Sequence, residues 1–135
     1  MAMHLSLSIF LVLKSFENDV VLDSLPTSHD HIPNTIEKKH GCIDDYTINF
    51  NCYYFKEGKD IAYNEKGHCA FSFPRDTYIY GYRISFFDKI KFNEQISSSK
   101  TILTYKGKLY TEEMKQLYEC LRNSSSVKRK FRKLL

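Results

Sequence analysis

The chain of 135 residues contains no tryptophan, and it is poor in the two residues that most often interrupt regular structure, with five glycines and three prolines. This scarcity excludes collagen-like and low-complexity classes, whose chains are rich in both residues. Apolar residues make up 42% of the chain and charged residues 27%, which is ordinary for a globular protein. The composition therefore predicts a folded chain, and its length predicts a single domain.

Long apolar runs are also missing. The apolar stretch of residues 5–13 is too short to span a bilayer. It resembles the apolar part of a secretory signal, but no positive charge precedes it and no small-residue cleavage site follows. We therefore expect neither a membrane span nor a signal peptide.

The four cysteines are widely spaced and form no C-x-x-C pair, which argues against a zinc ribbon or a thioredoxin-type motif. An even number of cysteines permits disulfides in a secreted protein. Because a signal peptide is not expected, the sequence predicts reduced thiols and a cytoplasmic location. The cysteines are Cys42, Cys52, Cys69 and Cys120.

Positive charge is concentrated at the C-terminal end. Of the net charge of +4, residues 123–135 supply +5 and contain no acid, so the remainder, with 15 basic and 16 acidic residues, carries −1. We predict one α+β domain over residues 1–123 and a basic tail over residues 124–135. The tail could bind an anionic membrane surface, serve as a nuclear-import or nucleic-acid patch, begin a linker, or remain solvated. Its candidate partner- or membrane-binding residues are Lys128, Arg129, Lys130, Arg132 and Lys133.

The aromatic residues are ten tyrosines and ten phenylalanines, and many of them fall in residues 67–87. Apolar and aromatic side chains alternate there with period two, which predicts two strands joined at a turn after Phe73. We expect these strands to form the centre of the sheet, with Cys69 as a core residue. The tyrosines at 78, 80 and 82 could stack unpaired bases, but Arg83 lies on the opposite face, so core packing is favoured.

The other segments extend this pattern. Residues 5–13 and 20–22 predict a hairpin, residues 46–55, 61–63 and 101–105 predict further strands, and residues 88–100 predict an exposed loop. Helices are predicted at residues 34–40 and from Thr111 to about Asn123. The second has an apolar stripe at i, i+3, i+4 and i+7, formed by Met114, Leu117, Tyr118 and Leu121. The expected fold is α+β, an antiparallel sheet of about five strands packed with two helices, of longin- or profilin-like architecture.

No pattern of residues predicts catalysis. G-x-S-x-G, H-E-x-x-H, P-loop and dinucleotide motifs are missing, and the adjacent His68 and Cys69 would point to opposite faces of a strand. Asp44 and Asp45 are expected to be solvated turn residues. One cluster resembles a set of zinc ligands, but its spacing fits no standard site, and solvated loop histidines are the favoured interpretation. That cluster is His29, His31, His40 and Cys42. We predict no enzyme activity, no cofactor and no metal.

Two aromatic segments, residues 70–73 and residues 80–83, resemble a pattern in the upstream, longin-like part of DENN domains. There an aromatic strand is followed by a turn and an aromatic-Gly-aromatic strand. The resemblance spans about residues 7–123, although residues 73–76 depart from the aliphatic strand usual in that family. It implies a role in membrane traffic. It implies no nucleotide exchange, because the downstream parts that engage a Rab GTPase would lie beyond Leu135.

The sequence thus predicts a non-enzymatic protein-interaction module that is one subunit of a larger cytoplasmic complex, with a protein partner in a hetero-oligomer. An exposed sheet edge or the groove beside the last helix would bind the partner. An assembly chaperone or adaptor acting as a heterodimer is one alternative. A nucleic-acid-binding protein that uses the basic tail is the other.

Overall fold

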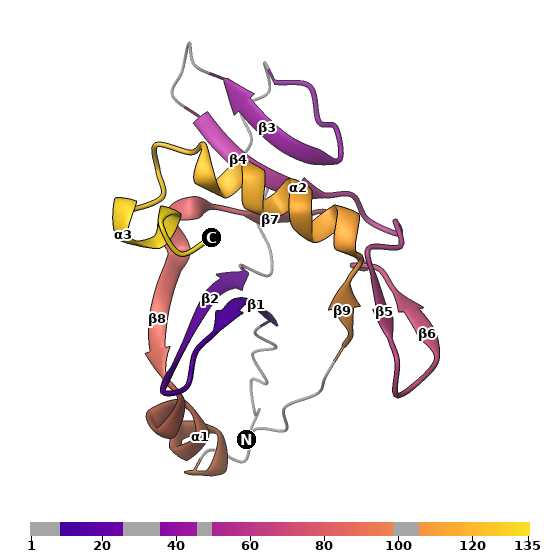
Figure 1. Cartoon of the computed structure of the whole chain (residues 1–135). Helices are drawn as coiled ribbons and strands as arrows, with labels where there is room; N and C mark the ends of the chain where they lie inside the picture. The colour runs from indigo at the N-terminus through magenta and orange to yellow at the C-terminus, as the bar shows by residue number, and fades with distance from the viewer. Residues whose placement is uncertain (1–8, 26–35, 46–49, 99–105) are drawn as a thin grey trace, which may run out of the picture.

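The computed structural model describes residues 9–25, 36–45, 50–98 and 106–135, and the chain is an α+β protein (Figure 1). The described strands form three small antiparallel sheets of three strands each. The predicted α+β class is confirmed, whereas the prediction of one sheet of about five strands is wrong. The strands are β1 (Ile9–Ser15), β2 (Asp19–Leu25), β3 (Gly41–Asp45), β4 (Phe50–Phe55), β5 (Ala62–Asn64), β6 (Cys69–Phe71), β7 (Thr77–Ile79), β8 (Ile84–Asp88) and β9 (Lys108–Leu109).

The first sheet, in the order β1-β2-β8, begins with the predicted hairpin. A tight turn joins its strands, because the Phe16 amide donates to the carbonyl of Asp19 at 2.8 Å. The second strand is longer than predicted, and β8 adds to its other edge with Val21 opposite Phe86. Leu13 and Val21 are buried, so one face of the sheet lies against the core.

The second sheet, in the order β3-β4-β7, has a central strand that is buried on both faces. Tyr53 and Phe55 point into the main core, while Cys52 and Tyr54 point into a second, smaller one. Alternation along β4 therefore separates two apolar clusters and does not divide core from solvent. In the smaller cluster the rings of Tyr54 and Tyr78 stack at 5.2 Å between centroids.

The third sheet, in the order β6-β5-β9, is the smallest. The turn after β5 is stabilised by Asn64, whose side-chain oxygen accepts hydrogen bonds from the amides of Lys66 and Gly67. The predicted strand at residues 61–63 is thus confirmed, as β5. The face that carries Ala62 packs against the core, and Tyr63 is exposed on the other.

Residues 67–87 do not form the centre of one sheet. β6, β7 and β8 lie in three different sheets, and a 3₁₀ turn, η1 (Gly81–Arg83), separates the last two. A Cβ at Gly81 would lie 2.3 Å from Val127 Cγ2, so a glycine lets the C-terminal segment pass here. Cys69, predicted to be buried, is exposed because it sits beside the turn at the tip of the β5–β6 hairpin. The interpretation of Tyr78 and Tyr80 as core residues is confirmed.

Three helices occur in the described residues: α1 (Lys89–Ser98), α2 (Thr111–Arg122) and α3 (Arg129–Arg132). The prediction of an exposed loop over residues 88–100 is wrong, because α1 occupies most of it. The side chain of Asp88 caps this helix by accepting hydrogen bonds from the amides of Ile90 and Lys91, at 2.9 and 3.2 Å.

The predicted helix at residues 34–40 is also wrong where it can be judged. Residues 36–40 are irregular and lead directly into β3, and residues 34 and 35 lie outside the described residues. β3 itself was not predicted. The strand predicted at residues 101–105, and the first part of that predicted at residues 46–55, also lie outside the described residues.

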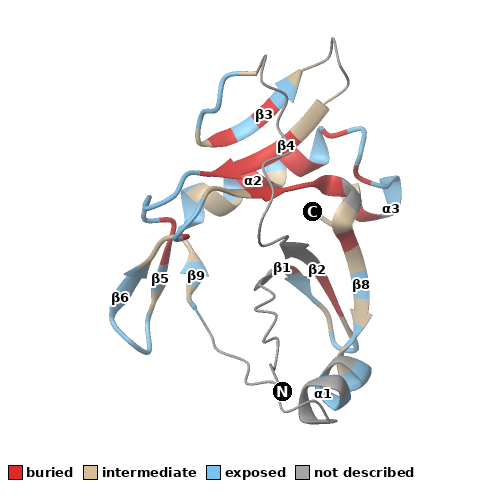
Figure 2. Ribbon diagram, turned by 180° about the vertical axis from the view of Figure 1, so that it is seen from behind, coloured by how far each residue is buried: buried red, intermediate tan, exposed pale blue. Residues whose placement is uncertain are grey.

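The predicted final helix is confirmed as α2, which begins at Thr111 with Tyr110 at the N-cap position. Leu117 and Leu121 are buried, and Met114 and Tyr118 pack against the same cluster. Figure 2 shows the buried stretches of the chain around α2 and β4. The main core joins all three sheets to α2 and to the C-terminal segment, with Leu13, Val21, Tyr53, Phe55, Ile61, Ala62, Phe73, Ile79, Ile84, Leu117, Cys120, Leu121, Val127 and Phe131.

The C-terminal segment folds back onto this core. Val127 and Phe131 are buried, and the Phe131 ring packs on Phe86 of β8 with centroids 5.1 Å apart. Lys14 of β1 donates to the carbonyl of Leu134 at 2.7 Å. The apolar residues interleaved in the basic segment therefore anchor it to the first sheet.

Candidate functional site at the junction of β3 and α2

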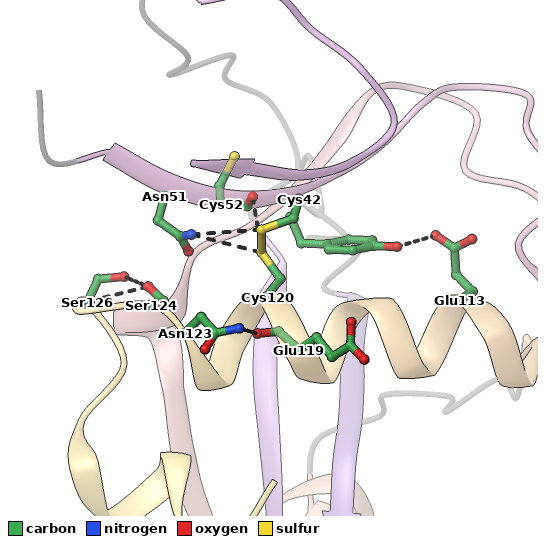
Figure 3. The surroundings of a disulfide bond; sticks show 10 residues. Cys42, Asn51, Cys52, Glu113, Glu119, Cys120, Asn123, Ser124 and Ser126 are labelled. Carbon is green, nitrogen blue, oxygen red and sulfur yellow. Dashed lines mark hydrogen bonds between the residues drawn. A yellow bond between two sulfur atoms is a disulfide. The ribbon is translucent and has the colours of Figure 1, made fainter. Parts of the chain in front are cut away.

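A disulfide joins Cys42 of β3 to Cys120 of α2, across 78 residues of sequence (Figure 3). Cys42 lies opposite Tyr53 in the sheet, on the face that α2 covers. The prediction of reduced thiols is wrong for these two cysteines, because β3 brings Cys42 to the helix, and β3 was not predicted. Cys52 and Cys69 take part in no disulfide.

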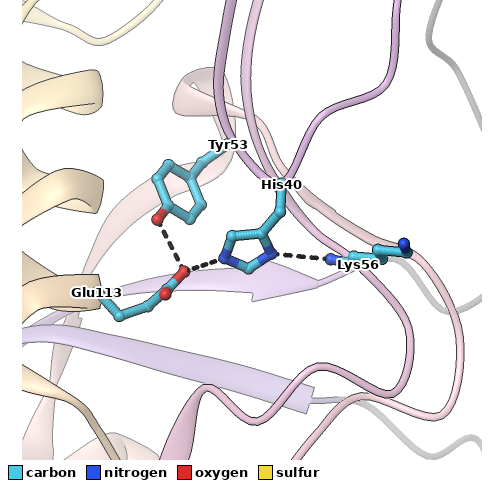
Figure 4. A network of polar contacts seen from close by, with 4 residues as sticks. All are labelled: His40, Tyr53, Lys56 and Glu113. Carbon is cyan, nitrogen blue, oxygen red and sulfur yellow. Dashed lines mark hydrogen bonds and ion pairs between the residues drawn. The ribbon is translucent and has the colours of Figure 1, made fainter.

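A hydrogen-bonded network links the first turn of α2 to the second sheet (Figure 4). One carboxylate oxygen of Glu113, Oε1, lies 2.6 Å from His40 Nε2 and accepts a hydrogen bond from the Tyr53 hydroxyl at 2.8 Å. The side chains of His40 and Glu113 are each only 11% exposed. A carboxylate in the first turn of a helix is also favoured by the helix dipole.

His40 is satisfied at both ring nitrogens. The amide of Lys56 donates to Nδ1 at 3.1 Å, so Nδ1 acts as an acceptor and Nε2 carries the proton that is shared with Glu113. The imidazole thus ties the start of β3 to the end of β4 and to the helix.

Two neighbouring tyrosines are held protonated by their surroundings. Burial, and then the hydrogen bond to Glu113, raise the pKa of Tyr53 far above its ordinary value. The pKa of Tyr54 is raised in the same way by burial and by Asp76, which accepts its hydroxyl proton at 2.8 Å. Both hydroxyls are therefore donors, one on each face of β4.

We expect Glu113→Ala to destabilise the fold more than Tyr53→Phe. The first change leaves two largely buried donors, on His40 and Tyr53, without their acceptor, and each such loss costs about 1–3 kcal/mol. The second leaves the contact between Glu113 and His40 in place and should cost about 1 kcal/mol. Urea unfolding at neutral pH measures both. Glu113→Gln, which keeps a side-chain oxygen, is the control, and equal losses for Ala and Gln would contradict the role of that oxygen.

An open groove of about 600 Å³ lies beside this network, at the end of the sheet where β3 begins and β4 ends. Four of its eight lining residues are lysines. The lining residues are Lys38, Lys39, His40, Tyr54, Lys56, Glu57, Gly58 and Lys59. Gly58 allows the tight turn here, because its φ is +73°.

The basic residues predicted to bind a partner lie at the other end of α2. Lys128, Arg129, Lys130 and Lys133 are exposed there, and Lys130 Nζ lies over the Phe131 ring at 5.1 Å. They do not contribute to the groove. Its lysines, on either side of the β3–β4 pair, were not singled out from the sequence, although the dense run of lysines at residues 38–39 and 56–59 was a signal that could have drawn attention to it.

The structure describes two of the four residues in the cluster that resembles a set of zinc ligands. His29 and His31 lie outside the described residues, His40 contacts Glu113, and Cys42 cannot act as a thiolate ligand because its sulfur is in the disulfide. Asp44 is exposed and Asp45 half-buried at the end of β3. In the described part of the chain, no group of three or more histidine, cysteine or acidic residues is placed to hold a metal ion.

Comparisons with known proteins give no relative for this chain: no family model, no curated protein and no solved structure matches it. Among the described residues, no helix combines the length and the apolar content needed to cross a bilayer.

Proposed function

We propose that this protein is a non-enzymatic interaction module, one subunit of a larger complex, and that it binds its partner at the edge of the second sheet. The observation that supports this best is that β3 is an edge strand among the described strands. Among the described strands it pairs with β4 alone, and we propose that a strand from a partner pairs with its other edge. The disulfide to α2 fixes this strand in place before binding, which reduces the entropy cost of association.

The polar network beside β3 supports a non-enzymatic role. His40, Tyr53 and Glu113 are the residues of the site that most resemble a catalytic group, and they use their hydrogen-bonding capacity on one another and on the backbone. Such a network stabilises one arrangement of helix and sheet.

A role in membrane traffic, as a longin-like component, is the particular function that we propose within this class. It rests on the aromatic pattern described above, and a heterodimeric chaperone or adaptor is the alternative. The exposed basic residues around α3 would suit an anionic membrane surface. We propose the cytoplasm as the compartment. This compartment requires that the disulfide between Cys42 and Cys120 persist in a reducing environment, where disulfides are rare.

The native complex tests this function. The chain carrying a purification tag is isolated from its source cells after thiols are blocked, its mass is measured, and co-purifying proteins are identified. We expect a stoichiometric protein partner, whose identity separates trafficking from assembly. The blocked thiols also report the redox state of Cys42 and Cys120. A monomer without a partner would contradict the proposal.

A pair of matched variants locates the interface. Asp44→Pro removes a backbone donor from β3 and should abolish co-purification of the partner if that edge is used. Asp60→Pro, at an exposed position outside the described strands, is the comparison. Circular dichroism of both variants shows whether the fold is kept, and loss of the partner from both would contradict docking at β3.

A further inference from the structure

The groove beside β3 has a charge that the network and the disulfide do not explain. Four lysines and one glutamate line it, whereas the chain outside the C-terminal segment carries a net charge of −1. We propose that this groove binds an acidic segment of the protein partner, with carboxylate or phosphate side chains placed among Lys38, Lys39, Lys56 and Lys59. This inference rests on the proposed function, because it names the chemistry of the partner's segment.

The fold brings the lysines together from two segments. Lys38 and Lys39 precede β3, and Lys56 and Lys59 follow β4. Because Gly41 lies opposite Tyr54 in the antiparallel pair, both segments leave the sheet at the same end. The hydrogen bond from the Lys56 amide to His40 holds the two walls together, and that from the Gly58 amide to the Phe73 carbonyl, at 3.0 Å, fixes the turn.

Acidic groups of the chain neutralise only part of this charge. Lys39 lies 3.9 Å from Glu37, but both side chains are 78% exposed, and such surface pairs contribute little. Asp76 Oδ1 accepts hydrogen bonds from the Tyr54 hydroxyl and from the Glu57 amide. Lys56 and Lys59 form no ion pair with another described residue. Their ammonium groups therefore attract an anion.

The lining favours an acidic polypeptide over a nucleic acid. Binding of single strands depends on exposed aromatic rings that stack on bases, but Tyr54, the aromatic residue of the groove, is 4% exposed. A nucleic acid carries a phosphate at every position of its backbone, so one phosphate would lie near Glu57 and be repelled by it. A peptide can instead place a neutral or basic residue beside Glu57. Lysine ammonium groups suit carboxylates that are spread along a flexible chain.

The groove borders the start of β3, and this continuity links it to the proposed edge. A strand added to β3 would continue past His40 into the region of Lys38 and Lys39. Its main chain would supply affinity, and acidic side chains in the groove would fix its register. Lys38 also lies over the Tyr78 ring, 5.8 Å from Nζ to the centroid, which positions this lysine at the wall.

Fluorescence anisotropy with the full, oxidised chain tests the inference. The probe is a short fluorescein-labelled peptide in which glutamate alternates with serine. We expect binding at low salt that weakens as salt is raised, and a loss of about tenfold or more in affinity for Lys56→Glu/Lys59→Glu. Lys106→Glu/Lys108→Glu is the matched control, because both residues are exposed, lie outside the groove and undergo the same charge change.

Three results would overturn the inference: no binding by the unchanged chain, an equal loss in both double variants, or tighter binding of a single-stranded oligonucleotide of the same net charge. Thermal melts of both variants verify that they fold, and Lys56→Gln/Lys59→Gln should give an intermediate loss. If the native partner is found but co-purifies equally with Lys56→Glu/Lys59→Glu, the groove assignment fails while the interaction module stands. If no partner is found, it is the proposed function that fails.

Discussion

Replacing Cys42 and Cys120 with alanine is expected to lower the free energy of unfolding by about 4 kcal/mol, the largest effect of any change at the candidate site. The disulfide closes a loop of 78 residues, and opening it restores to the unfolded chain the conformational freedom that the bond removes. Urea unfolding of the oxidised chain and of the double variant measures the difference. The same comparison by calorimetry should show a fall in Tm of roughly 10 °C or more.

Cys69→Ala is the matched control, because this cysteine is free and exposed. It should change the stability by less than about 0.5 kcal/mol. Addition of a reductant to the unchanged chain should reproduce most of the loss seen in the double variant, and should leave the double variant unaffected. If reductant changes neither, the bond between β3 and α2 does not form in solution.

Phe131→Ala is the second change with a large expected effect, about 3 kcal/mol or more. The ring is 3% exposed and packs on Phe86, so its removal leaves a cavity between α3 and the first sheet. The change should also release the C-terminal segment. Trypsin would then cleave at the basic residues of that segment long before it cleaves the rest of the chain, and timed proteolysis with mass spectrometry measures this.

Arg129→Ala, at an exposed position of the same short helix, provides the comparison. It removes a charge and no buried surface, so the stability should change by less than about 0.5 kcal/mol. Equal sensitivity of the two variants to trypsin would mean that residues 124–135 behave as a free tail. A protected segment in the unchanged chain and a released one in Phe131→Ala would make α3 part of the folded domain.

The sequence predicted the elements whose burial follows a simple period. In α2 the stripe from Met114 to Leu121 faces one core, and in β1 and β2 the hairpin follows from alternation around a turn. α1 could not be found in this way, because its sequence contains only three apolar residues in ten and Ile90 is 68% exposed. Its recognisable signal was the cap at Asp88, which pairs with the backbone just beyond it.

Sheet membership is the property that alternation cannot give. A strand with one buried face has the same period whichever sheet it joins, so residues 67–87 were compatible with one sheet and with three. The break at Gly81 depends on contact with Val127, which is remote in sequence. Long-range contacts of this kind are set by packing and leave no local pattern.

The candidate site was hidden for the same reason. In the sequence, His40 was noted as a loop histidine, Tyr53 falls in a predicted strand and Glu113 falls in the predicted last helix. His40 and Tyr53 both contact Oε1 of Glu113, and His40 and Glu113 are 73 residues apart in the sequence. The pairing of Cys42 with Cys120 likewise needed the unpredicted strand β3. Residue types indicated possible partners, and only the fold selects among them.

The two buried faces of β4 have a consequence for the accuracy of folding. A slip of one residue in its pairing would exchange Tyr53 and Phe55 with Cys52 and Tyr54, because side chains alternate between the faces. In most half-buried strands such an error exposes apolar side chains to water. Here both sides would remain apolar, and the error would instead separate each tyrosine hydroxyl from its carboxylate, Glu113 on one face and Asp76 on the other. The correct register of β4 is therefore favoured by two partly buried hydrogen bonds, from Tyr53 to Glu113 and from Tyr54 to Asp76.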